Sequence, residues 1–162
     1  MTESKTEQAL FSSEEYVLRV TAFLRETSGW CTDHGLAVEG GVVTLREELI
    51  AEYEAPSLYI SKDGVSLAKI LPVGLRILCA RGRVDLIGRV ARHALLFQVG
   101  KGPALSTQTI VGGKTTSSSS APLLSRVDRD GWYWIEAQVR RPKRVEESLF
   151  LDLLTDVSDY EF

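Results

Sequence analysis

Residues 57–99 read SLYISKDGVSLAKILPVGLRILCARGRVDLIGRVARHALLFQV, and this stretch decides the fold class. Its apolar runs are short, and turn signals separate them. The first signal, Lys62-Asp63-Gly64, lies between the runs 58–60 and 65–71. Asp-Gly between two apolar runs is a strong hairpin signal, because glycine accepts the positive φ that the turn needs. Further runs follow at 75–80, 83–87 and 94–99. Strands this closely spaced can be joined only by tight turns, so the stretch predicts an antiparallel meander.

One helix is predicted on each side of the meander. Ser12 and Glu15 have the spacing of a capping box, and one apolar helical face follows, formed by Tyr16, Val17, Val20, Phe23 and Leu24. Gly29 is the expected end of this helix. Pro142 suits the first turn of a closing helix, whose apolar residues recur at Val145, Leu149, Leu153 and Val157. The predicted fold is therefore α+β, an antiparallel meander sheet of about five to seven strands packed by an N-terminal and a C-terminal helix.

The segments beside the meander leave alternatives open. Gly35 and Gly40-Gly41 indicate turns, and the runs 36–38 and 42–45 are compatible with short strands. Residues 46–53 fit either a helical turn or a strand, and their alternation slightly favours the strand. After the meander, Asp-Arg-Asp-Gly at 128–131 predicts a second hairpin between 123–127 and 132–139.

Length and composition are typical of a single globular domain over residues 1–162, with a frayed N-terminus at 1–11 and a flexible Gly/Ser/Thr-rich loop at 112–121. No apolar run approaches the roughly 18 residues that span a bilayer, so no membrane contact is predicted. Residues 1–7 lack the pattern of a secretion signal. Cys31 and Cys79 lie far apart in the sequence and are expected to be reduced thiols. These observations predict a cytoplasmic protein.

Charge is distributed unevenly along the chain. Residues 1–61 carry a net charge of -7, residues 62–144 carry +10, and residues 145–162 carry -6. A basic sheet that stays open would attract an anionic partner, whereas acidic helices packed on it would neutralise it internally. The pI of about 5.5 favours internal neutralisation over general nucleic-acid binding.

Two short motifs invite a chemical interpretation, and neither has the pattern that its chemistry needs. Gly112-Gly113-Lys114-Thr115 resembles the end of a phosphate-binding P-loop, but Gln108 stands where that pattern has its first glycine. Cys31-Thr32-Asp33-His34 brings a thiol and an imidazole together, but zinc would need further Cys or His ligands. The sequence therefore predicts no cofactor, no metal site and no catalytic residue, and an enzyme is less expected than a binding protein.

The first candidate binding group is Arg81, Arg83 and Asp85. Arg83 and Asp85 are two residues apart on a predicted strand, so their side chains share one face. The pair is interpreted first as a surface or partly buried ion pair that fixes strand register. The alternative is an anion-binding face that uses the planar arginine fork.

The second candidate group is Trp132, Trp134 and Arg140. The two tryptophans share one face of a predicted strand, and the opposite face, with Tyr133, is the expected core side. Tryptophan and arginine are enriched in interface hot spots, and aromatics beside cations also suit stacking on single-stranded nucleic acid. The alternative is that a helix covers both tryptophans.

The leading hypothesis is a non-catalytic cytosolic interaction protein, of bacterial type, that acts through a protein partner or by homodimerisation. The alternative is binding of an anionic ligand or single-stranded nucleic acid on a basic sheet face, for which affinity would fall steeply with salt.

Overall fold

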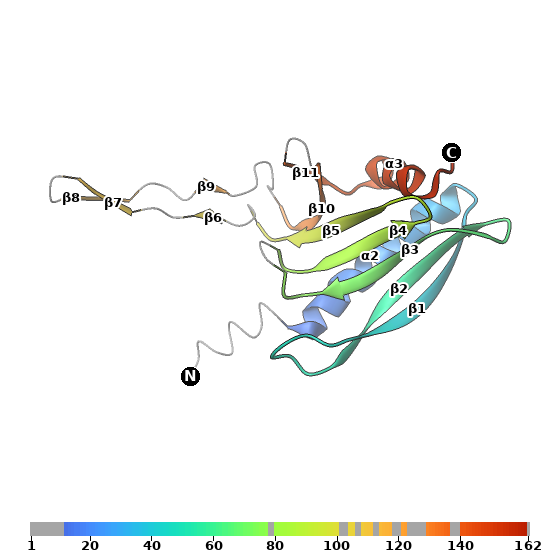
Figure 1. Ribbon diagram of the computed structural model, residues 1–162, viewed down its shortest axis with the longest axis horizontal. Coiled ribbons are helices and arrows are strands. Elements are labelled where there is room, and N and C mark those ends of the chain that lie inside the picture. Colours follow the sequence, from blue (N-terminus) through green and yellow to red (C-terminus); the bar gives the residue numbers. More distant parts are fainter. Residues whose placement is uncertain are drawn as a thin grey trace.

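The computed structural model describes residues 12–161, apart from 78–79, 101–103, 106–107, 112–113, 118–120, 123–128 and 137–139. Between residues 104 and 122 it describes backbone pairing alone. The chain forms one seven-stranded antiparallel sheet with an N-terminal and a C-terminal helix (Figure 1). The predicted α+β meander is confirmed.

The strand order of the sheet is β1-β2-β3-β4-β5-β10-β11. These strands are β1 (Ala37–Leu45), β2 (Tyr53–Lys62), β3 (Val65–Gly74), β4 (Arg83–Gly88), β5 (Arg92–Gln98), β10 (Gly131–Glu136) and β11 (Arg141–Arg144). Because the order follows the chain, β1 and β11 are the two edges. The hairpin at Lys62-Asp63-Gly64 is confirmed, since Lys62 pairs with Val65 and both Asp63 and Gly64 have positive φ.

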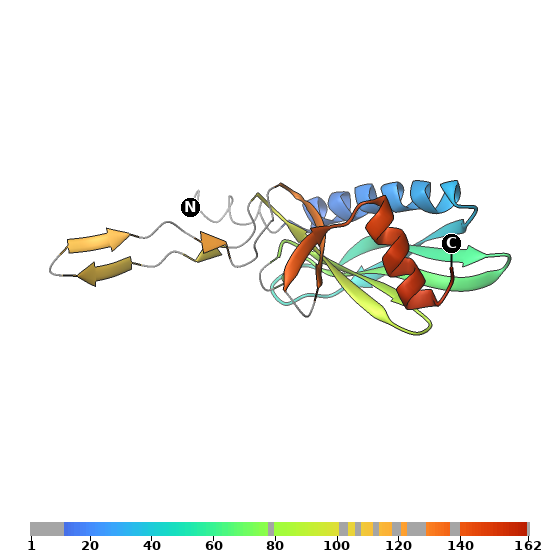
Figure 2. The same cartoon turned by 90° about the horizontal axis from the view of Figure 1, so that it is seen from above.

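Four short strands form two ladders outside this sheet. β6 (Ala104–Leu105) pairs with β9 (Ala121–Pro122), and β7 (Gln108–Val111) pairs with β8 (Lys114–Ser117). Figure 1 and Figure 2 draw both ladders away from the sheet and its helices. The predicted flexible loop at 112–121 thus contains β8, and its residues 112–113 and 118–120 lie outside the described residues, as does the predicted frayed segment 1–11.

Helix α2 (Ser13–Asp33) begins where the capping box predicts. The Ser12 hydroxyl accepts a hydrogen bond from the Glu15 N–H at 3.3 Å. The prediction that the helix ends at Gly29 is wrong. The helix continues to Asp33 because Cys31, on its inward face, is fully buried in the core, which outweighs the cost of about 1 kcal/mol for a mid-helix glycine.

Helix α3 (Glu147–Ser158) presents the predicted apolar face, but Pro142 does not start it. Pro142 lies in the edge strand β11, where its missing N–H is tolerated as well as it would be in the first turn of a helix. The predicted partner strand of the second hairpin, residues 123–127, lies outside the described residues. β10 pairs with β5 and with β11.

Both helices cover the same face of the sheet. Phe23 of α2 packs on Trp132 of β10, with ring centroids 5.3 Å apart. On α3, the Val157 carbonyl lies so close to β4 that a Cβ at Gly88 would be 2.1 Å from its oxygen. The core between helices and sheet contains the fully buried side chains of Val20, Ile60, Ile70, Leu86, Leu95, Phe150 and Leu154. Figure 2 shows α2 and α3 beside the strands, and the opposite face of the sheet carries no described helix.

Tyr16 fastens α2 to one end of the sheet. Its hydroxyl donates to the Arg83 carbonyl at 2.6 Å and accepts from the Val73 and Gly74 N–H groups, each at 3.2 Å. Burial raises the pKa of this phenol above its ordinary value. One hydroxyl therefore satisfies three backbone groups at the ends of β3 and β4.

Residues 46–52 form neither the helix nor the strand that the sequence allows, but a loop whose Glu47 side chain bonds to the segment after β3. The Glu47 carboxylate accepts from the Leu75 N–H at 3.1 Å and the Arg76 N–H at 3.0 Å, and also from the Tyr53 hydroxyl. Of the predicted strand at 75–80, residues 78–79 lie outside the described residues, and Ile77 and Ala80 form an isolated bridge. The Leu75 and Arg76 N–H groups are satisfied by the Glu47 side chain.

Candidate interaction surfaces

The predicted Arg83–Asp85 ion pair is present. Arg83 Nε lies 2.7 Å from Asp85 Oδ1, Arg83 Nη2 lies 3.1 Å from Oδ2, and Arg92 Nη2 approaches the same oxygen at 3.8 Å. Asp85 is only 5% exposed, and a buried carboxylate needs a partner for its charge. The bidentate contact with Arg83 supplies that partner. The cross-strand partners of Asp85 are Leu71 and Ala94, which places the pair on the face away from the helices. Arg81 lies just before β4, and its N–H donates to the Phe97 carbonyl at 2.8 Å.

The tryptophans of β10 face the helices, so the prediction that the Tyr133 side is the core side is wrong. Trp132 is 7% exposed and packs between Phe23 and Phe97. Trp134 is half-buried, and its indole N–H donates to His93 Nδ1 at 3.3 Å. Tyr133 points to the other face and is also buried, and its hydroxyl donates to the Arg129 carbonyl at 2.8 Å.

The predicted patch of Trp132, Trp134 and Arg140 is therefore not one exposed surface. Trp132 belongs to the core, and Arg140 is an exposed turn residue with φ 48° between β10 and β11. The cation beside the Trp134 ring is Lys143, whose ammonium lies 5.8 Å from the ring centroid. Alternation places residues on two faces of a strand but does not tell which face the helices cover.

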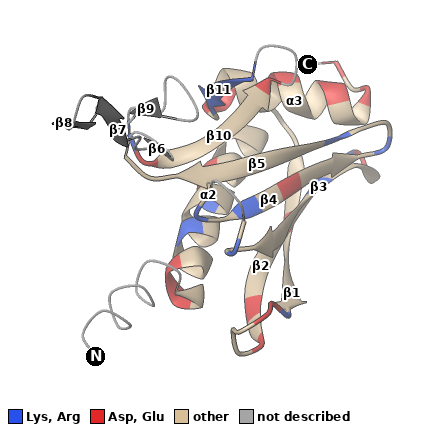
Figure 3. Cartoon of the chain, turned by 60° about the vertical axis from the view of Figure 1, so that its left-hand side comes forward, with Lys and Arg blue, Asp and Glu red and all other residues tan. Residues whose placement is uncertain are grey.

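Acidic and basic blocks meet within the fold. Figure 3 marks acidic residues in red on α3 and at the start of α2, and basic residues in blue on β4 and β11. Glu146, just before α3, lies 3.3 Å from Arg129 and 3.9 Å from Arg144. Asp156 of α3 accepts from His93 Nε2 at 2.5 Å. Part of the basic charge of the sheet is thus neutralised internally.

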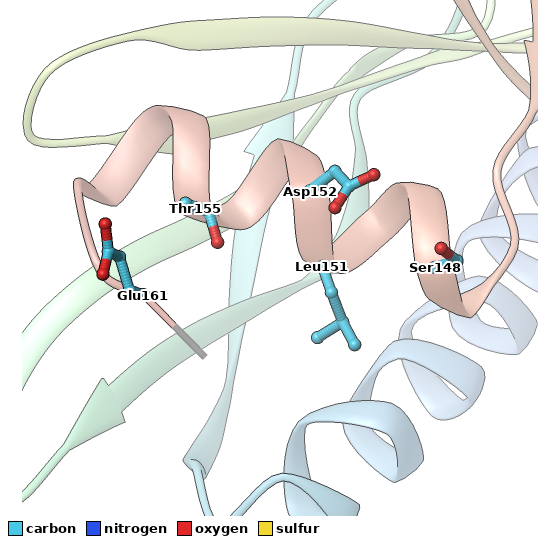
Figure 4. Close-up of a pocket in the computed structure, with 5 residues that line it drawn as sticks. All are labelled: Ser148, Leu151, Asp152, Thr155 and Glu161. Carbon is cyan, nitrogen blue, oxygen red and sulfur yellow. The ribbon is translucent and has the colours of Figure 1, made fainter.

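A shallow cavity on the outer side of α3 is lined by Ser148, Leu151, Asp152, Thr155 and Glu161 (Figure 4). Its two charged groups are both carboxylates, and the side chains in Figure 4 point in different directions rather than toward one point. This arrangement converges on no ligand.

A smaller cavity of about 220 Å³ lies between α2 and β10, above Phe23, Phe97 and Trp132. Its two arginines are already engaged. The Arg19 guanidinium lies 4.4 Å from the Phe97 ring centroid, and Arg144 Nη1 donates to the Asp130 carbonyl at 2.7 Å. The volume is below the range of roughly 300–1,000 Å³ that small-molecule sites occupy.

The β1 edge is built differently from these sites. β1 pairs with β2 along all nine of its residues, from Ala37–Ser61 to Leu45–Tyr53, and no described strand lies on its other side. Alternate N–H and C=O groups of an edge strand point away from its neighbour and are free to pair. β1 contains a single charged residue, Glu39, and no proline.

A groove of about 340 Å³ runs beside this edge, between β1–β2 and the flank of α2. We call it the β1 groove, and it is lined by Thr21, Leu24, Arg25 and Ser28 of α2 with Gly40, Gly41, Val42, Pro56, Ser57 and Leu58 of the sheet. Val42 is 66% exposed, which is unusual for a valine in a strand. A Cβ at Gly40 would meet nothing within 4 Å, so the groove is empty above this residue.

The two glycines of β1 differ in what surrounds them. At Gly41, a Cβ would lie 2.7 Å from Ser57 Oγ and 2.9 Å from the Tyr59 ring, on the face away from the groove. Sequence reasoning placed a turn at Gly40-Gly41, and this prediction is wrong, because pairing with β2 carries the strand straight through both residues. The nine-residue stretch with one charge and no proline was the available signal for a continuous strand.

The described residues of the Cys31-Thr32-Asp33-His34 motif belong to none of the surfaces described above. Cys31 is a free, buried thiol, and burial raises its pKa to about 12. His34 Nε2 lies 3.3 Å from Glu147 Oε1. Cys79, Gly112 and Gly113 lie outside the described residues. Within the part of the chain that the structure describes, no three His, Cys, Asp or Glu residues are grouped to hold a metal ion, and neither helix could cross a bilayer.

Comparison with known proteins gives no relative: no family model, no curated protein and no solved structure matches this chain.

Proposed function

We propose that this protein is an interaction module that binds a protein strand along the β1 edge. The observation that supports the proposal is the combination at β1 of a long edge, beside which no described strand lies, and an apolar groove. An added strand would pair with the outward backbone groups of β1, which supplies affinity without regard to sequence.

Side chains of the added strand would supply selectivity. Alternate side chains of that strand point to the groove side, where Val42, Pro56 and Leu58 offer apolar contact. Burial of one valine-sized or leucine-sized side chain there would contribute about 1.5–3 kcal/mol. Arg25 is the single charged residue that lines the groove, so the proposal favours an apolar side chain at this point.

Site-specific photo-crosslinking in the protein's own cells tests the proposal. A photoreactive phenylalanine analogue at position 42 should give a discrete covalent adduct with a protein. The same analogue at position 90 is the matched control, because Val90 is similarly exposed at 59% but lies far along the chain in the β4–β5 turn. No adduct at position 42, or equal adducts at both positions, would overturn the proposal.

The alternative, anion binding on the sheet face away from the helices, has weaker support. Lys69 and Arg92 flank Ile87 on that face, but Asp85 lies buried in the next row and already occupies Arg83. Binding there would show affinity that falls steeply with added salt, whereas strand pairing at β1 would not.

A cytoplasmic location and a bacterial type of protein remain part of the proposal. The free, buried thiol of Cys31 supports a reducing compartment, since disulfides predominate in secreted proteins.

A further inference from the structure

We infer that the strand added to β1 is β1 of a second copy, paired antiparallel about a twofold axis so that the two sheets become one. This inference rests on the proposed function, namely that the β1 edge accepts a strand, and it names the occupant. Closed twofold dimers are the commonest oligomers, and one interface would cover the open edge of both copies.

Backbone pairing restricts the register of such a dimer. Groups that point outward belong to alternate residues of β1, so only residues that are both odd-numbered or both even-numbered can form a hydrogen-bonded pair. Among the allowed registers, one pairs all nine residues of Ala37–Leu45 with their counterparts. It places Gly41 on the twofold axis, Ala37 opposite Leu45 and Glu39 opposite Val43. About eight to ten hydrogen bonds would form.

Side chains fit this register on the groove side. Val42 of one copy lies directly opposite Gly40 of the other, and cross-strand partners point to the same face of a sheet. Val42 is 66% exposed, and the position of a Cβ at Gly40 has no atom within 4 Å. The exposed valine of each copy therefore enters the empty space above the glycine of the other copy.

Charge also permits self-pairing at β1 and opposes it at β11. Glu39 is the one charged residue of β1, and in this register it faces Val43 rather than a second carboxylate. β11 reads Arg-Pro-Lys-Arg, so pairing with its own copy would bring cations together across a strand that has only three N–H donors. Of the two edges of the seven-stranded sheet, β1 is thus the one that can pair with itself.

The test measures the oligomeric state of the full chain by light scattering and sedimentation between about 1 and 200 µM. The expected mass is twice the 17.9 kDa of the chain at the upper end of this range. Gly40→Lys puts a cation on the groove side of the edge, beside Arg25 and opposite Val42 of the second copy, and its Cβ would meet nothing within 4 Å in its own chain. We therefore expect a folded protein with dimerisation weakened by about tenfold or more.

Exchange of the two residues gives the decisive control. Val42→Gly alone should weaken the dimer, because it removes the side chain that fills the space. Gly40→Val combined with Val42→Gly restores a valine opposite a glycine and should recover dimerisation. A double variant as weak as Val42→Gly alone would overturn the register.

Crosslinking tests the register independently. In a Cys79→Ser background, the pair Glu39→Cys and Val43→Cys should form a disulfide between copies, whereas either single cysteine should not, because positions 39 and 39 lie about 13 Å apart along the strand. A monomer at all concentrations, without this disulfide, overturns the inference. If position 42 still photo-crosslinks to a different protein, the proposed function stands and the occupant is that protein.

Discussion

The two edges of the sheet are built in opposite ways. β11 has four residues, of which one is proline and three are cations, whereas β1 has nine residues, one charge and no proline. Short length, proline and positive charge are devices that keep strand edges from pairing. β1 has none of them and lies beside an apolar groove. The difference teaches that the fold protects one edge and leaves the other available for pairing.

The largest expected effect is on stability, and it differs between a residue near β11 and a residue of β1. Trp132, beside β11, is 7% exposed and packs on Phe23 and Phe97, so Trp132→Ala should lower the free energy of unfolding by about 3–5 kcal/mol. Val42→Ala at the β1 edge should change it by about 0.5 kcal/mol or less, since Val42 is 66% exposed. Urea unfolding of the monomers measures both. Equal losses would contradict the assignment of Val42 to a surface rather than to the core.

A second substitution tests how much the Tyr16 hydroxyl stabilises the ends of β3 and β4. Tyr16→Phe removes a hydroxyl that serves Arg83, Val73 and Gly74, and should lower the free energy of unfolding by about 2–3 kcal/mol. Tyr59→Phe is the control, because Tyr59 is 43% exposed and should tolerate the change. Thermal unfolding compares the two. A Tyr16→Phe variant as stable as the control would show that water replaces the three bonds.

Stability should also fall at alkaline pH. Burial raises the pKa of the Cys31 thiol from 9.0 to about 12, so the unfolded chain releases its proton first. The stability that the protonated thiol contributes is complete below pH 9.0 and is lost as pH rises toward about 12. Tyr16 and Tyr53, whose pKa values burial also raises, act in the same direction. Cys31→Ala should flatten part of this decline in urea titrations, and an unchanged slope would contradict a buried neutral thiol.

The smallest expected effect comes from removing the protection of β11. Arg141→Thr with Pro142→Val restores an N–H donor and removes a cation from this edge. We expect weak new self-association at high concentration, measured by sedimentation in the Gly40→Lys background so that β1 contributes less. A variant that stays strictly monomeric would show that the short length and the two remaining cations are enough to protect β11.

Local sequence was sufficient for most of the meander, except the run at 75–80, and insufficient for the edges of the sheet. Lys62-Asp63-Gly64 forms the predicted hairpin, because turn chemistry is decided by the residues of the turn itself. The Gly40-Gly41 turn failed because pairing with β2, a tertiary interaction, overrode glycine's weak preference. The prediction that Pro142 starts the closing helix was wrong, because a helix start and an edge strand both tolerate the missing N–H of proline.

The candidate site was less predictable still. The Arg83–Asp85 ion pair could be predicted, because residues two positions apart on a strand point to the same face. The role of Trp132 depended on which face the helices cover, which alternation cannot reveal. The β1 groove depends on strand order and on the position of α2 over β2, and no local pattern encodes either of these.

Hydrogen exchange of the backbone amides at low and high protein concentration tests the central claim most directly. If β1 pairs with a second copy, the amides of residues 37–45 should become more protected as concentration rises, while those of residues 141–144 should not change. Amides of β1 that exchange at one concentration-independent rate, or protection that appears at β11 instead, would contradict the assignment of β1 as the pairing edge.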